Sequence, residues 1–493
     1  MIYNFNLGIG WASSGVEYAQ IYRARMFRNI GVDAKFVFTD MFPQENMEHM
    51  TKNIGFLDSE VIWLYTFFTD FKTAPVTYTL SDLEKTFSNM EYTKSREGKI
   101  CRYVFGGSNN FYTAYMVNDH DDFVHRVELV SNGCLIRKDY FTYGRVYSEY
   151  YAPLDNKAHL YHRRFFNENG SVAYEEIIDD DRVMYKFKDK ILCSKEEFVG
   201  YMVSQLHLTK DDVVLIDRST DIGQSILMNC KPARVGTVVH ADHFSEKDTN
   251  DDYILWNNFY EYEFNMHKHI DFYICSTQAQ SDLMVQQFEK YYGVTPCVYT
   301  IPVGSLPELK YPSSTRKPYS LITASRLASE KHVDWICKAV IQARSEVPEL
   351  SLDIYGEGGE KSKLETIIRE NNASSYIHLM GQHDLSEVYQ NYEAYIAGST
   401  SEGFGLTLME AVGGGLPIIG FDVRYGNPTF IRDGENGYLI DLPEEDKDKI
   451  EALRKGIVDL FKQNLEKCHS VSYLVAKDFL TSNVQEKWRE AVC

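Results

Sequence analysis

Two glutamates, Glu402 and Glu410, are separated by seven residues and enclose a glycine-broken loop. On one continuous helix, eight steps of roughly 100° would leave their side chains about 80° apart, so they would not share a face. We therefore expect Glu402 in a loop and Glu410 on the second turn of a helix that begins near Gly405. The first carboxylate could accept hydrogen bonds from sugar hydroxyls, and the second could bind a ribose diol. The alternative is two solvated surface acids, since charged residues are usually exposed.

The residues around this loop predict the elements that position it. A strand-like run at 394–398 precedes the loop, and a second apolar run at 418–421 follows a glycine-rich stop at 413–417. The order strand, loop, helix, loop, strand is typical of a parallel sheet covered by helices. Backbone amides of the loop and the positive end of the helix dipole would both favour an anion there.

The same run carries a resemblance to a known family. Residues 399–411, STSEGFGLTLMEA, resemble the donor-sugar loop of retaining glycosyltransferases of the glycogen-synthase-like family 4. Residues 8–19 and 239–246 resemble the catalytic subunit of the accessory Sec system glycosyltransferases, which add the first sugar to Ser and Thr of serine-rich-repeat adhesins in Gram-positive bacteria. The resemblance covers nearly the whole chain. It implies an α/β GT-B fold with two facing Rossmann-like domains and an all-β insert domain in the N-terminal half.

The resemblance also assigns roles to basic residues and to a histidine. Arg326 and Lys331 would neutralise the leaving diphosphate and so replace a metal ion, although two basic residues in a loop are otherwise usually solvated. His240 ends a buried-type strand, where α/β sheets bind ligands, and would contact the donor sugar; a capping or core histidine is the alternative. The predicted catalytic residues are His240, Arg326, Lys331 and Glu402.

A second set of residues is expected to bind the donor nucleotide sugar. The glycine-rich turn before residue 18 would lie near the phosphates, although such a turn alone is equally ordinary tight-turn chemistry. The loop after 377–380 would hold the uridine base, and the Glu402 loop and its helix would hold the sugar and ribose. The predicted donor-binding residues are Gly15, Val16, Glu17, Tyr18, Gln382, His383, Glu402, Gly403, Phe404, Gly405, Leu406 and Glu410.

No metal or cofactor is expected beyond the donor substrate. His240, His243 and Glu246 lack a fourth ligand or an open-site pattern, so they do not predict a metal site. The donor would be UDP-N-acetylglucosamine (UDP-GlcNAc) or UDP-glucose, because the sequence does not decide what fits around the second carbon of the sugar.

Composition restricts the class of protein. The chain has 493 residues with 51 Lys and Arg against 71 Asp and Glu, a net charge of −20, which disfavours nonspecific nucleic-acid binding. Nine scattered cysteines without a C-x-x-C pair indicate a reducing compartment. The N-terminus does not resemble a signal peptide, and no apolar run approaches the roughly 18 residues of a spanning helix. We expect a cytoplasmic protein, at most peripheral at the inner face of the membrane.

The pattern changes between residues 74 and 190. After a helical stretch at 80–90, short aromatic and β-branched runs separated by Asn- and Gly-rich turns predict antiparallel hairpins. The runs are 101–105, 111–117, 123–130, 140–148, 159–166, 172–178 and 182–187. By resemblance this insert binds the partner and the acceptor protein; a merely stabilising sheet is the alternative.

The insert divides the chain into predicted domains. Residues 1–73 and 191–305 would form the acceptor-side Rossmann-like domain, and residues 306–480 the donor-nucleotide domain. The segment from about 447 to 492 is expected to be helical, and its end, 481–493, to pack back on the N-terminal domain.

These features predict a retaining transfer from a UDP-sugar to Ser or Thr hydroxyls, with same-face attack. By resemblance, the chain works with a homologous non-catalytic, glycosyltransferase-like subunit. The alternatives are a small-molecule or glycolipid glycosyltransferase, and a non-catalytic adhesin chaperone.

Overall fold

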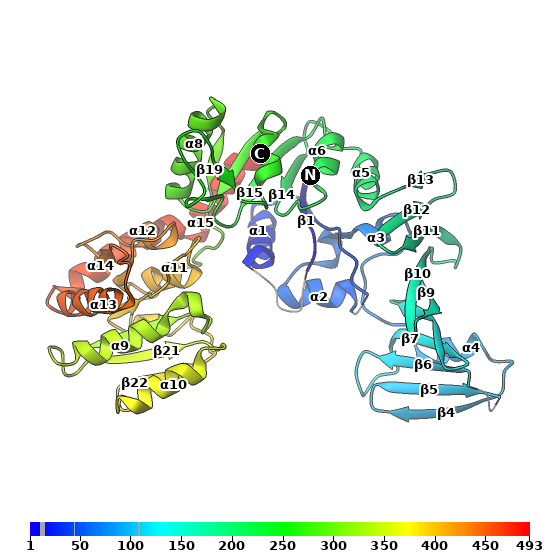
Figure 1. Ribbon diagram of the computed structural model, residues 1–493, viewed down its shortest axis with the longest axis horizontal. Helices are drawn as coiled ribbons and strands as arrows, with labels where there is room; N and C mark the ends of the chain where they lie inside the picture. Colours follow the sequence, from blue (N-terminus) through cyan, green and yellow to red (C-terminus); the bar gives the residue numbers. More distant parts are fainter. Residues whose placement is uncertain (10–14, 44, 107–108) are drawn as a thin grey trace. The chain divides into compact units, whose positions relative to one another are not determined.

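The computed structural model describes residues 1–493 except 10–14, 44 and 107–108 (Figure 1). Part of the predicted glycine-rich turn, 10–14, and of one predicted hairpin turn, 107–108, therefore lies outside the described residues. The chain forms two compact units. Unit 1 contains Met1–Ala24, Val32–Thr237 and Asn258–Asp271, and unit 2 contains Arg25–Gly31, Val238–Asn257 and Phe272–Cys493.

Unit 1 contains a parallel sheet with the strand order β15-β14-β1-β2-β3. Its strands are β1 (Ile2–Asn6), β2 (Ala34–Phe38), β3 (Val61–Trp63), β14 (Val213–Ile216) and β15 (Arg234–Val239). Every residue of β14 is buried, as expected of a strand that is covered on both faces. The crossover after β1 is helix α1 (Gly15–Ile30).

A buried polar cluster fastens α1 to this sheet. The Arg23 guanidinium donates two hydrogen bonds to the Asp217 carboxylate, at 2.7 and 2.8 Å, and a third to Asn4 Oδ1 at 2.9 Å. Gln20 Nε2 donates to Asp217 Oδ2 at 2.8 Å. The Arg23 and Asp217 side chains are at most 2% exposed, so this bidentate pair is fully desolvated.

The insert is a ten-stranded antiparallel sheet in which every strand pairs with its neighbours along the chain. The strands are β4 (Tyr92–Glu97), β5 (Ile100–Phe105), β6 (Phe111–Met116), β7 (Val124–Ser131), β8 (Cys134–Phe141), β9 (Arg145–Leu154), β10 (Lys157–Phe166), β11 (Val172–Asp179), β12 (Arg182–Lys186) and β13 (Ile191–Leu192). Helix α4 (Leu80–Lys85) precedes them and is shorter than predicted.

The predicted strand 140–148 is wrong, because the chain turns within it. Strand β8 ends at Phe141, β9 begins at Arg145, and the Thr142 amide donates to the Gly144 carbonyl at 3.0 Å. Aromatic side chains on both sides of the turn read as one continuous run. Strand β4 was not predicted, because its sequence, YTKSRE, has no alternation of apolar and polar residues. All six of its residues are exposed.

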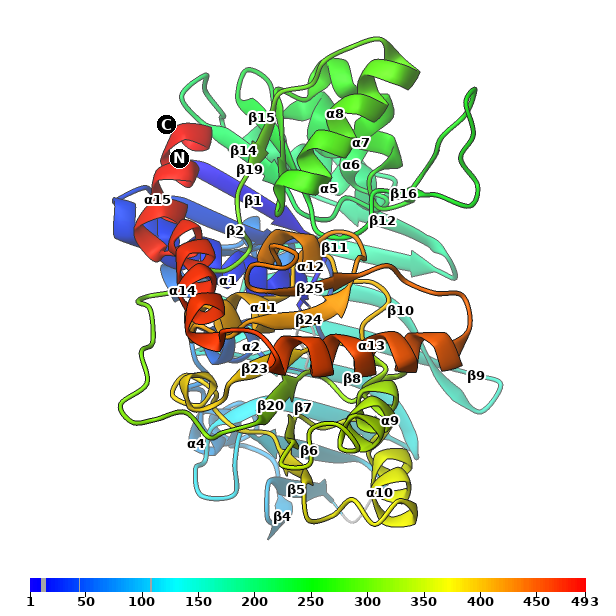
Figure 2. The same ribbon diagram turned by 90° about the vertical axis from the view of Figure 1, so that its left-hand side faces the viewer.

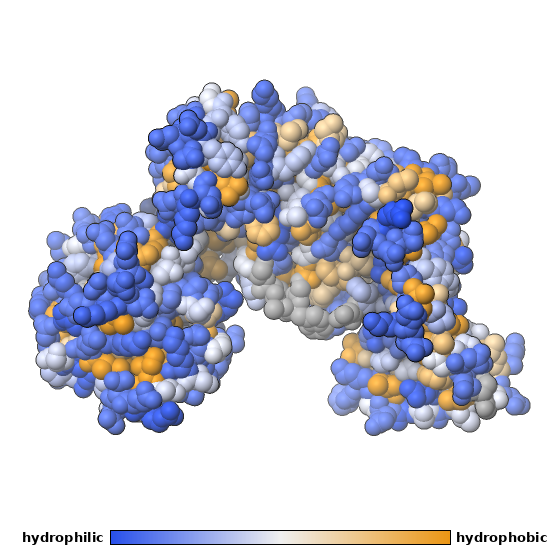
Figure 3. Space-filling model, in the orientation of Figure 1, coloured by the Kyte–Doolittle hydropathy of each residue, from blue (hydrophilic) through white to orange (hydrophobic). Residues whose placement is uncertain are grey.

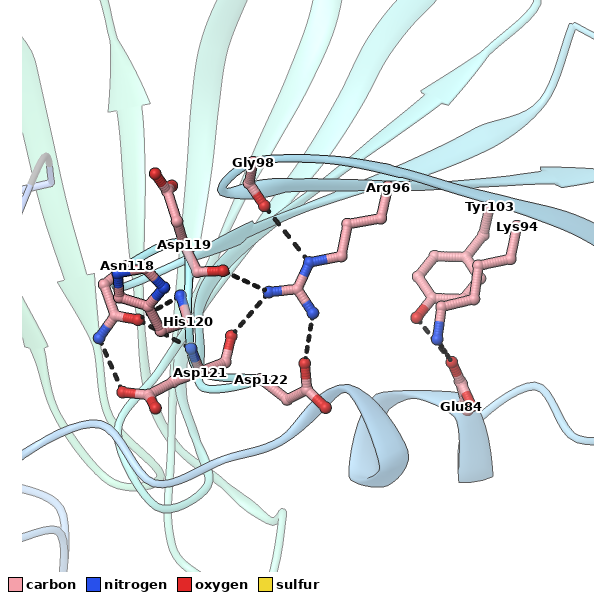
Figure 4. A network of polar contacts seen from close by, with 10 residues as sticks. All are labelled: Glu84, Lys94, Arg96, Gly98, Tyr103, Asn118, Asp119, His120, Asp121 and Asp122. Atoms are coloured by element: carbon pink, nitrogen blue, oxygen red, sulfur yellow. Dashed lines mark hydrogen bonds and ion pairs between the residues drawn. The ribbon is translucent and has the colours of Figure 1, made fainter.

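Two basic side chains hold the edge strand β4 in place (Figure 4). Lys94 Nζ lies 2.7 Å from Glu84 Oε1, which also accepts a hydrogen bond from the Tyr103 hydroxyl at 2.8 Å. The Arg96 guanidinium donates to Asp122 Oδ1 at 2.6 Å and to the carbonyls of Asp119 and Asp121. Charged side chains on an edge strand also discourage pairing with other chains.

Unit 2 contains a six-stranded parallel sheet with the order β22-β21-β20-β23-β24-β25. Its strands are β20 (Ser320–Ala324), β21 (Ser351–Tyr355), β22 (Ile377–Gly381), β23 (Ala394–Ile396), β24 (Ile418–Phe421) and β25 (Gly437–Ile440). Helices α9 (Val333–Ala343), α10 (Lys361–Glu370) and α13 (Asp446–Phe461) contribute to one apolar core. Helices α11 (Leu406–Gly413) and α14 (Leu465–Ala476) contribute to another.

The helical C-terminal segment consists of α13, α14 and α15 (Thr481–Val492) with short breaks (Figure 2). Trp488 of α15 packs edge-to-face on Phe27, with ring centroids 5.3 Å apart. Helix α15 also contacts β19 (Val298–Thr300), which pairs in parallel with β18 (Phe272–Cys275). The end of the chain therefore packs on elements from the N-terminal half and middle of the sequence.

The predicted α/β fold class with an all-β insert is confirmed by these sheets. Hydrophilic residues cover most of the face shown in Figure 3. Within the described residues, no helix combines the length and apolar character needed to span a bilayer. The nine cysteines are all free thiols.

Candidate active site

The loop with the two glutamates follows β23 and ends in α11, as predicted. Gly405 is the residue before the helix and has a φ of 88°, a left-handed conformation that glycine adopts without a Cβ penalty. Glu402 lies in the loop, and Glu410 is the fifth residue of α11, on its second turn. The start of α11 therefore directs its first-turn amides and the positive end of its dipole toward this loop.

Lys331 and Glu402 form an ion pair at this loop. Lys331 Nζ donates to Glu402 Oε2 at 2.5 Å, and the two side chains are 18% and 20% exposed. Lys331 ends a short 3₁₀ turn, Ser329–Lys331, that follows β20. Gly398, after β23, has no room for a side chain, since a Cβ there would lie 2.8 Å from the His332 carbonyl oxygen. This close approach brings the two connections together.

Arg326 belongs to the same connection but points to solvent. Its side chain is 80% exposed, and Nη2 lies 3.3 Å from Glu330 Oε1. The backbone on either side is fixed, because the Ser325 amide donates to the Tyr355 carbonyl and the Leu327 amide to the Glu357 carbonyl. The guanidinium therefore extends from a rigid loop, and it is not brought into the Lys331–Glu402 pair.

A third connection, after β24, holds the backbone of Glu402. The Glu402 amide donates to the Arg424 carbonyl at 3.1 Å, and the Glu402 carbonyl accepts from the amides of Tyr425 and Gly426 at 2.6 and 2.7 Å. These residues were missed from the sequence. Their position directly after a buried strand is the signal that could have found them, because ligands bind at the carboxyl ends of parallel strands.

Glu410 is held by a tyrosine that was also missed. The Tyr389 hydroxyl donates to Glu410 Oε2 at 3.0 Å, and Tyr389 itself is 3% exposed. Burial raises the pKa of Glu410 above its ordinary value, while the hydrogen bond from Tyr389 acts in the opposite direction. The sequence separation of 21 residues hides this pair.

The predicted base-binding residues Gln382 and His383 are exposed and follow β22. His383 Nε2 lies 2.8 Å from the Met380 carbonyl oxygen, and its ring meets the Tyr355 ring edge-on at 5.9 Å. The loop is thus ordered by local contacts, and its exposed face is available for a planar ligand.

The remaining residues of the Glu402 loop differ in where their side chains point. The Phe404 side chain is 5% exposed and packs against Phe430 and Phe479 in the core, so only its backbone can face a ligand. Leu406 packs on the linker, where a Cβ on Gly304 would lie 2.4 Å from Leu406 Cδ2. Gly403 is close to the His240 carbonyl oxygen, 3.6 Å from a Cβ built on this glycine.

His240 directly follows β15, and its carbonyl oxygen lies beside the Gly403 backbone. His243 is buried. His243 Nε2 lies 2.7 Å from Gln287 Oε1, and Nδ1 lies 3.3 Å from the Tyr425 hydroxyl. Burial lowers the pKa of His243 to about 4. His243 is therefore a neutral core histidine. Within the described part of the chain, no three His, Cys, Asp or Glu side chains gather as metal ligands would.

Gly15, Val16, Glu17 and Tyr18 form the first turn of α1 in unit 1, whereas the other predicted site residues belong to unit 2. Gly15 and Tyr18 are exposed, and Val16 is buried. Glu17 is 3% exposed, and its Oε1 lies 3.6 Å from Arg218 Nη1. The exposed residues of this turn can contact a ligand, and the buried ones fix the helix.

Within unit 2 the structure brings Lys331, Glu402, the start of α11 and the backbone after His240 together. A lysine and helix-terminal amides suit phosphate oxygens, and carboxylates suit hydroxyl groups. A sugar nucleotide has both kinds of group.

Two family models match this chain. "GtfA extended beta-sheet domain" matches residues 93–189, which are nearly the whole antiparallel insert. "Glycosyl transferases group 1" matches residues 310–474, which contain the six-stranded sheet and the Lys331–Glu402 site.

Whole-length relatives agree with these matches. The chain is 52% identical to the UDP-N-acetylglucosamine–peptide N-acetylglucosaminyltransferase GtfA subunit of Streptococcus agalactiae, over 99% of this chain and 97% of the relative. A solved GtfA/B complex contains a chain of 52% identity and TM-score 0.96, covering 100% of this chain and 99% of that one. The pneumococcal O-GlcNAc transferase GtfA, solved with UDP and GlcNAc, has 50% identity and TM-score 0.86, with 100% and 98% covered.

Proposed function

The chain belongs to the family of GtfA subunits of UDP-N-acetylglucosamine–peptide N-acetylglucosaminyltransferases, and on that premise we propose how its residues perform the transfer. It has the GT-B fold and transfers N-acetylglucosamine from UDP-GlcNAc to peptide. The acceptor groups are Ser and Thr hydroxyls of a serine-rich-repeat surface adhesin, which receives its first sugar before export. The motif resemblance at residues 8–19 and 239–246 supports this acceptor.

The observation that carries the proposal is the Lys331–Glu402 pair at the start of α11. When UDP-GlcNAc binds, Lys331 faces the diphosphate and Glu402 accepts hydroxyl hydrogen bonds from the sugar. Negative charge grows on the diphosphate as the glycosidic bond breaks, and a fixed cation stabilises that charge. Arg326 reaches the diphosphate from its rigid loop, and the amides at the start of α11 add their dipoles.

The reaction retains the configuration of the sugar. The acceptor hydroxyl attacks the face that the diphosphate leaves, and a phosphate oxygen takes its proton. No carboxylate nucleophile is then required. Lys331, Arg326 and backbone amides balance the negative charge of the diphosphate. The proposed transfer is therefore independent of a metal ion. His240 and the Gly403 backbone place the sugar, Glu410 binds the ribose, and Gln382 and His383 hold the base.

The remaining predicted assignments belong to the same proposal. Residues 1–73 and 191–305 form the acceptor-side domain, 306–480 the donor domain, and 481–493 the helix end that packs back on the former. From the motif resemblance alone, we also assign a phosphate-binding role to the exposed residues of the first turn of α1. Nine free cysteines support a reducing, cytoplasmic location, at most peripheral at the inner face of the membrane.

The chain assembles with a homologous glycosyltransferase-like subunit, since the solved relative at 52% identity is a GtfA/B complex. We assign contacts with this subunit and with the acceptor to the insert at 74–190, which includes the extended β-sheet domain.

Transfer can be tested with the chain and its partner subunit, radiolabelled UDP-GlcNAc and a serine-rich polypeptide. We expect label in the polypeptide and none in a matched polypeptide with Ser→Ala and Thr→Val changes. Transfer to glycolipid or small alcohols but not to the polypeptide would indicate a small-molecule enzyme. Binding of the polypeptide without release of UDP would indicate a chaperone.

A further inference from the structure

Glu410 is hydrogen-bonded to Tyr389, a residue that has no role in the proposed reaction. Glu410 lies on α11, and Tyr389 begins a short 3₁₀ turn, Tyr389–Asn391, before β23. The Tyr389 hydroxyl donates to Glu410 Oε2 at 3.0 Å. Burial and the nearby Glu410 charge raise the pKa of Tyr389 well above 10, so its hydroxyl stays protonated and remains a donor at neutral pH.

The pairing uses one of the two carboxylate oxygens. Among the described residues, Tyr389 is the hydrogen-bond donor that the structure shows for the Glu410 side chain, and this bond engages Oε2. A glutamate has several rotatable bonds, so a carboxylate held at one oxygen loses fewer conformations when a ligand binds the other.

We propose that Tyr389 is a positioning residue, whose hydroxyl holds Glu410 Oε2 so that Oε1 accepts a ribose hydroxyl of UDP. The inference rests on the proposed function of Glu410 as the ribose-binding residue. Tyr389 does not touch the donor itself. Its 3% exposure places it behind Glu410, in the core that also contains Tyr392 and Tyr395.

The same bond affects the charge of Glu410. Burial raises the pKa of Glu410, the nearby Asp384 charge raises it further, and the hydrogen bond from Tyr389 lowers it. Removing the Tyr389 hydroxyl should therefore raise this pKa. As the pH is lowered, UDP binding to the variant should therefore begin to weaken at a higher pH than binding to the wild type. The reason is that the ionised carboxylate is the stronger acceptor.

The test is a binding cycle with Tyr389→Phe, measured by calorimetry on the intact complex with UDP, 2′-deoxy-UDP and 3′-deoxy-UDP. We expect Tyr389→Phe to weaken UDP binding about three- to tenfold, the effect of one hydrogen bond. For the deoxy analogue that lacks the hydroxyl bound by Glu410, the same substitution should cost less than twofold. A purely structural defect would weaken all three ligands equally, and this result would overturn the inference.

Tyr392→Phe is the matched control, because the Tyr392 hydroxyl donates to Asp353 Oδ2 at 2.7 Å and not to Glu410. It should leave all three affinities unchanged. If Tyr389→Phe does not fold, Glu410→Gln in the wild-type background takes its place. It should lose affinity for UDP but not for the critical deoxy analogue, and equal losses would overturn the inference. A wild-type complex that does not bind UDP would instead reject the proposed function.

Discussion

Lys331 Nζ lies 2.5 Å from Glu402 Oε2, although the two residues belong to different connections of the six-stranded sheet. Lys331 follows β20 and Glu402 follows β23, and these strands are neighbours. Both connections leave the carboxyl ends of the strands, where α/β sheets bind ligands. In the proposed mechanism, a phosphate and a sugar hydroxyl replace these contacts when the donor binds.

Replacing Lys331 by alanine should lower kcat for peptide glycosylation by about 100-fold or more. The substitution removes the cation that we propose stabilises the leaving diphosphate, and such groups contribute on this scale. Release of UDP at saturating donor and acceptor is the measurement. Lys338→Ala is the control, because this lysine on α9 pairs with Asp334 at 3.7 Å. A kcat within a few-fold of the wild type would remove Lys331 from the proposed mechanism.

Arg326→Ala should weaken UDP binding but leave the stability of the fold almost unchanged. The side chain is 80% exposed and its ion pair with Glu330 lies at the surface, so the free energy of unfolding should change by less than about 0.5 kcal/mol. UDP affinity should fall about tenfold through the loss of one charge-assisted contact. Glu330→Gln breaks the same ion pair and should leave UDP affinity intact. Equal UDP affinity in Arg326→Ala and the wild type would place the guanidinium outside the site.

Gly398→Ala should disturb the site through the backbone. The new Cβ would lie 2.8 Å from the His332 carbonyl oxygen and 3.1 Å from that of Lys331. The connection must shift, so Lys331 should separate from Glu402 and kcat should fall at least tenfold. Gly359→Ala is the matched control, since nothing lies within 4 Å of its Cβ. Comparable kcat values for the two variants would contradict the predicted shift.

Asp217→Asn should destabilise unit 1 by about 3 kcal/mol. The change leaves the Arg23 guanidinium buried without its charge partner, and breaking such a pair is costly. Thermal unfolding followed by circular dichroism measures the effect as a lower Tm. Asp179→Asn is the control, because its pair with Arg182 is 77% and 89% exposed and should contribute little. Similar Tm values for both variants would show that the buried pair is not stabilising.

Stability should decrease between pH 6.5 and pH 4 because of His243. Burial lowers the pKa of this histidine from 6.5 to about 4, so in this range the unfolded chain binds a proton that the folded chain does not. Stability is then greatest above pH 6.5, and the loss by pH 4 is about 3 kcal/mol. Urea unfolding at pH 7.0 and 5.5 should show a smaller difference for His243→Asn than for the wild type. An unchanged difference would mean that His243 does not titrate on unfolding.

The sequence was sufficient for features that depend on local periodicity. The eight-residue step from Glu402 to Glu410 placed one in a loop and the other on the second turn of a helix, as α11 shows. The Asn-Gly pairs at 132–133 and 169–170 located two of the insert hairpins. The edge strand β4 was missed because its six exposed residues carry no burial pattern, and the turn at Thr142 was hidden inside an aromatic run.

Tertiary structure decided which residues meet. Tyr389 and Glu410 are 21 residues apart, Lys331 and Glu402 are 71, and no periodicity links either pair. Tertiary structure also decided that the Phe404 ring turns into the core and that Arg326 extends into solvent. The reason is physical: chain-local preferences select helices, strands and turns, whereas partners across a sheet depend on strand order and on the close approach that Gly398 allows.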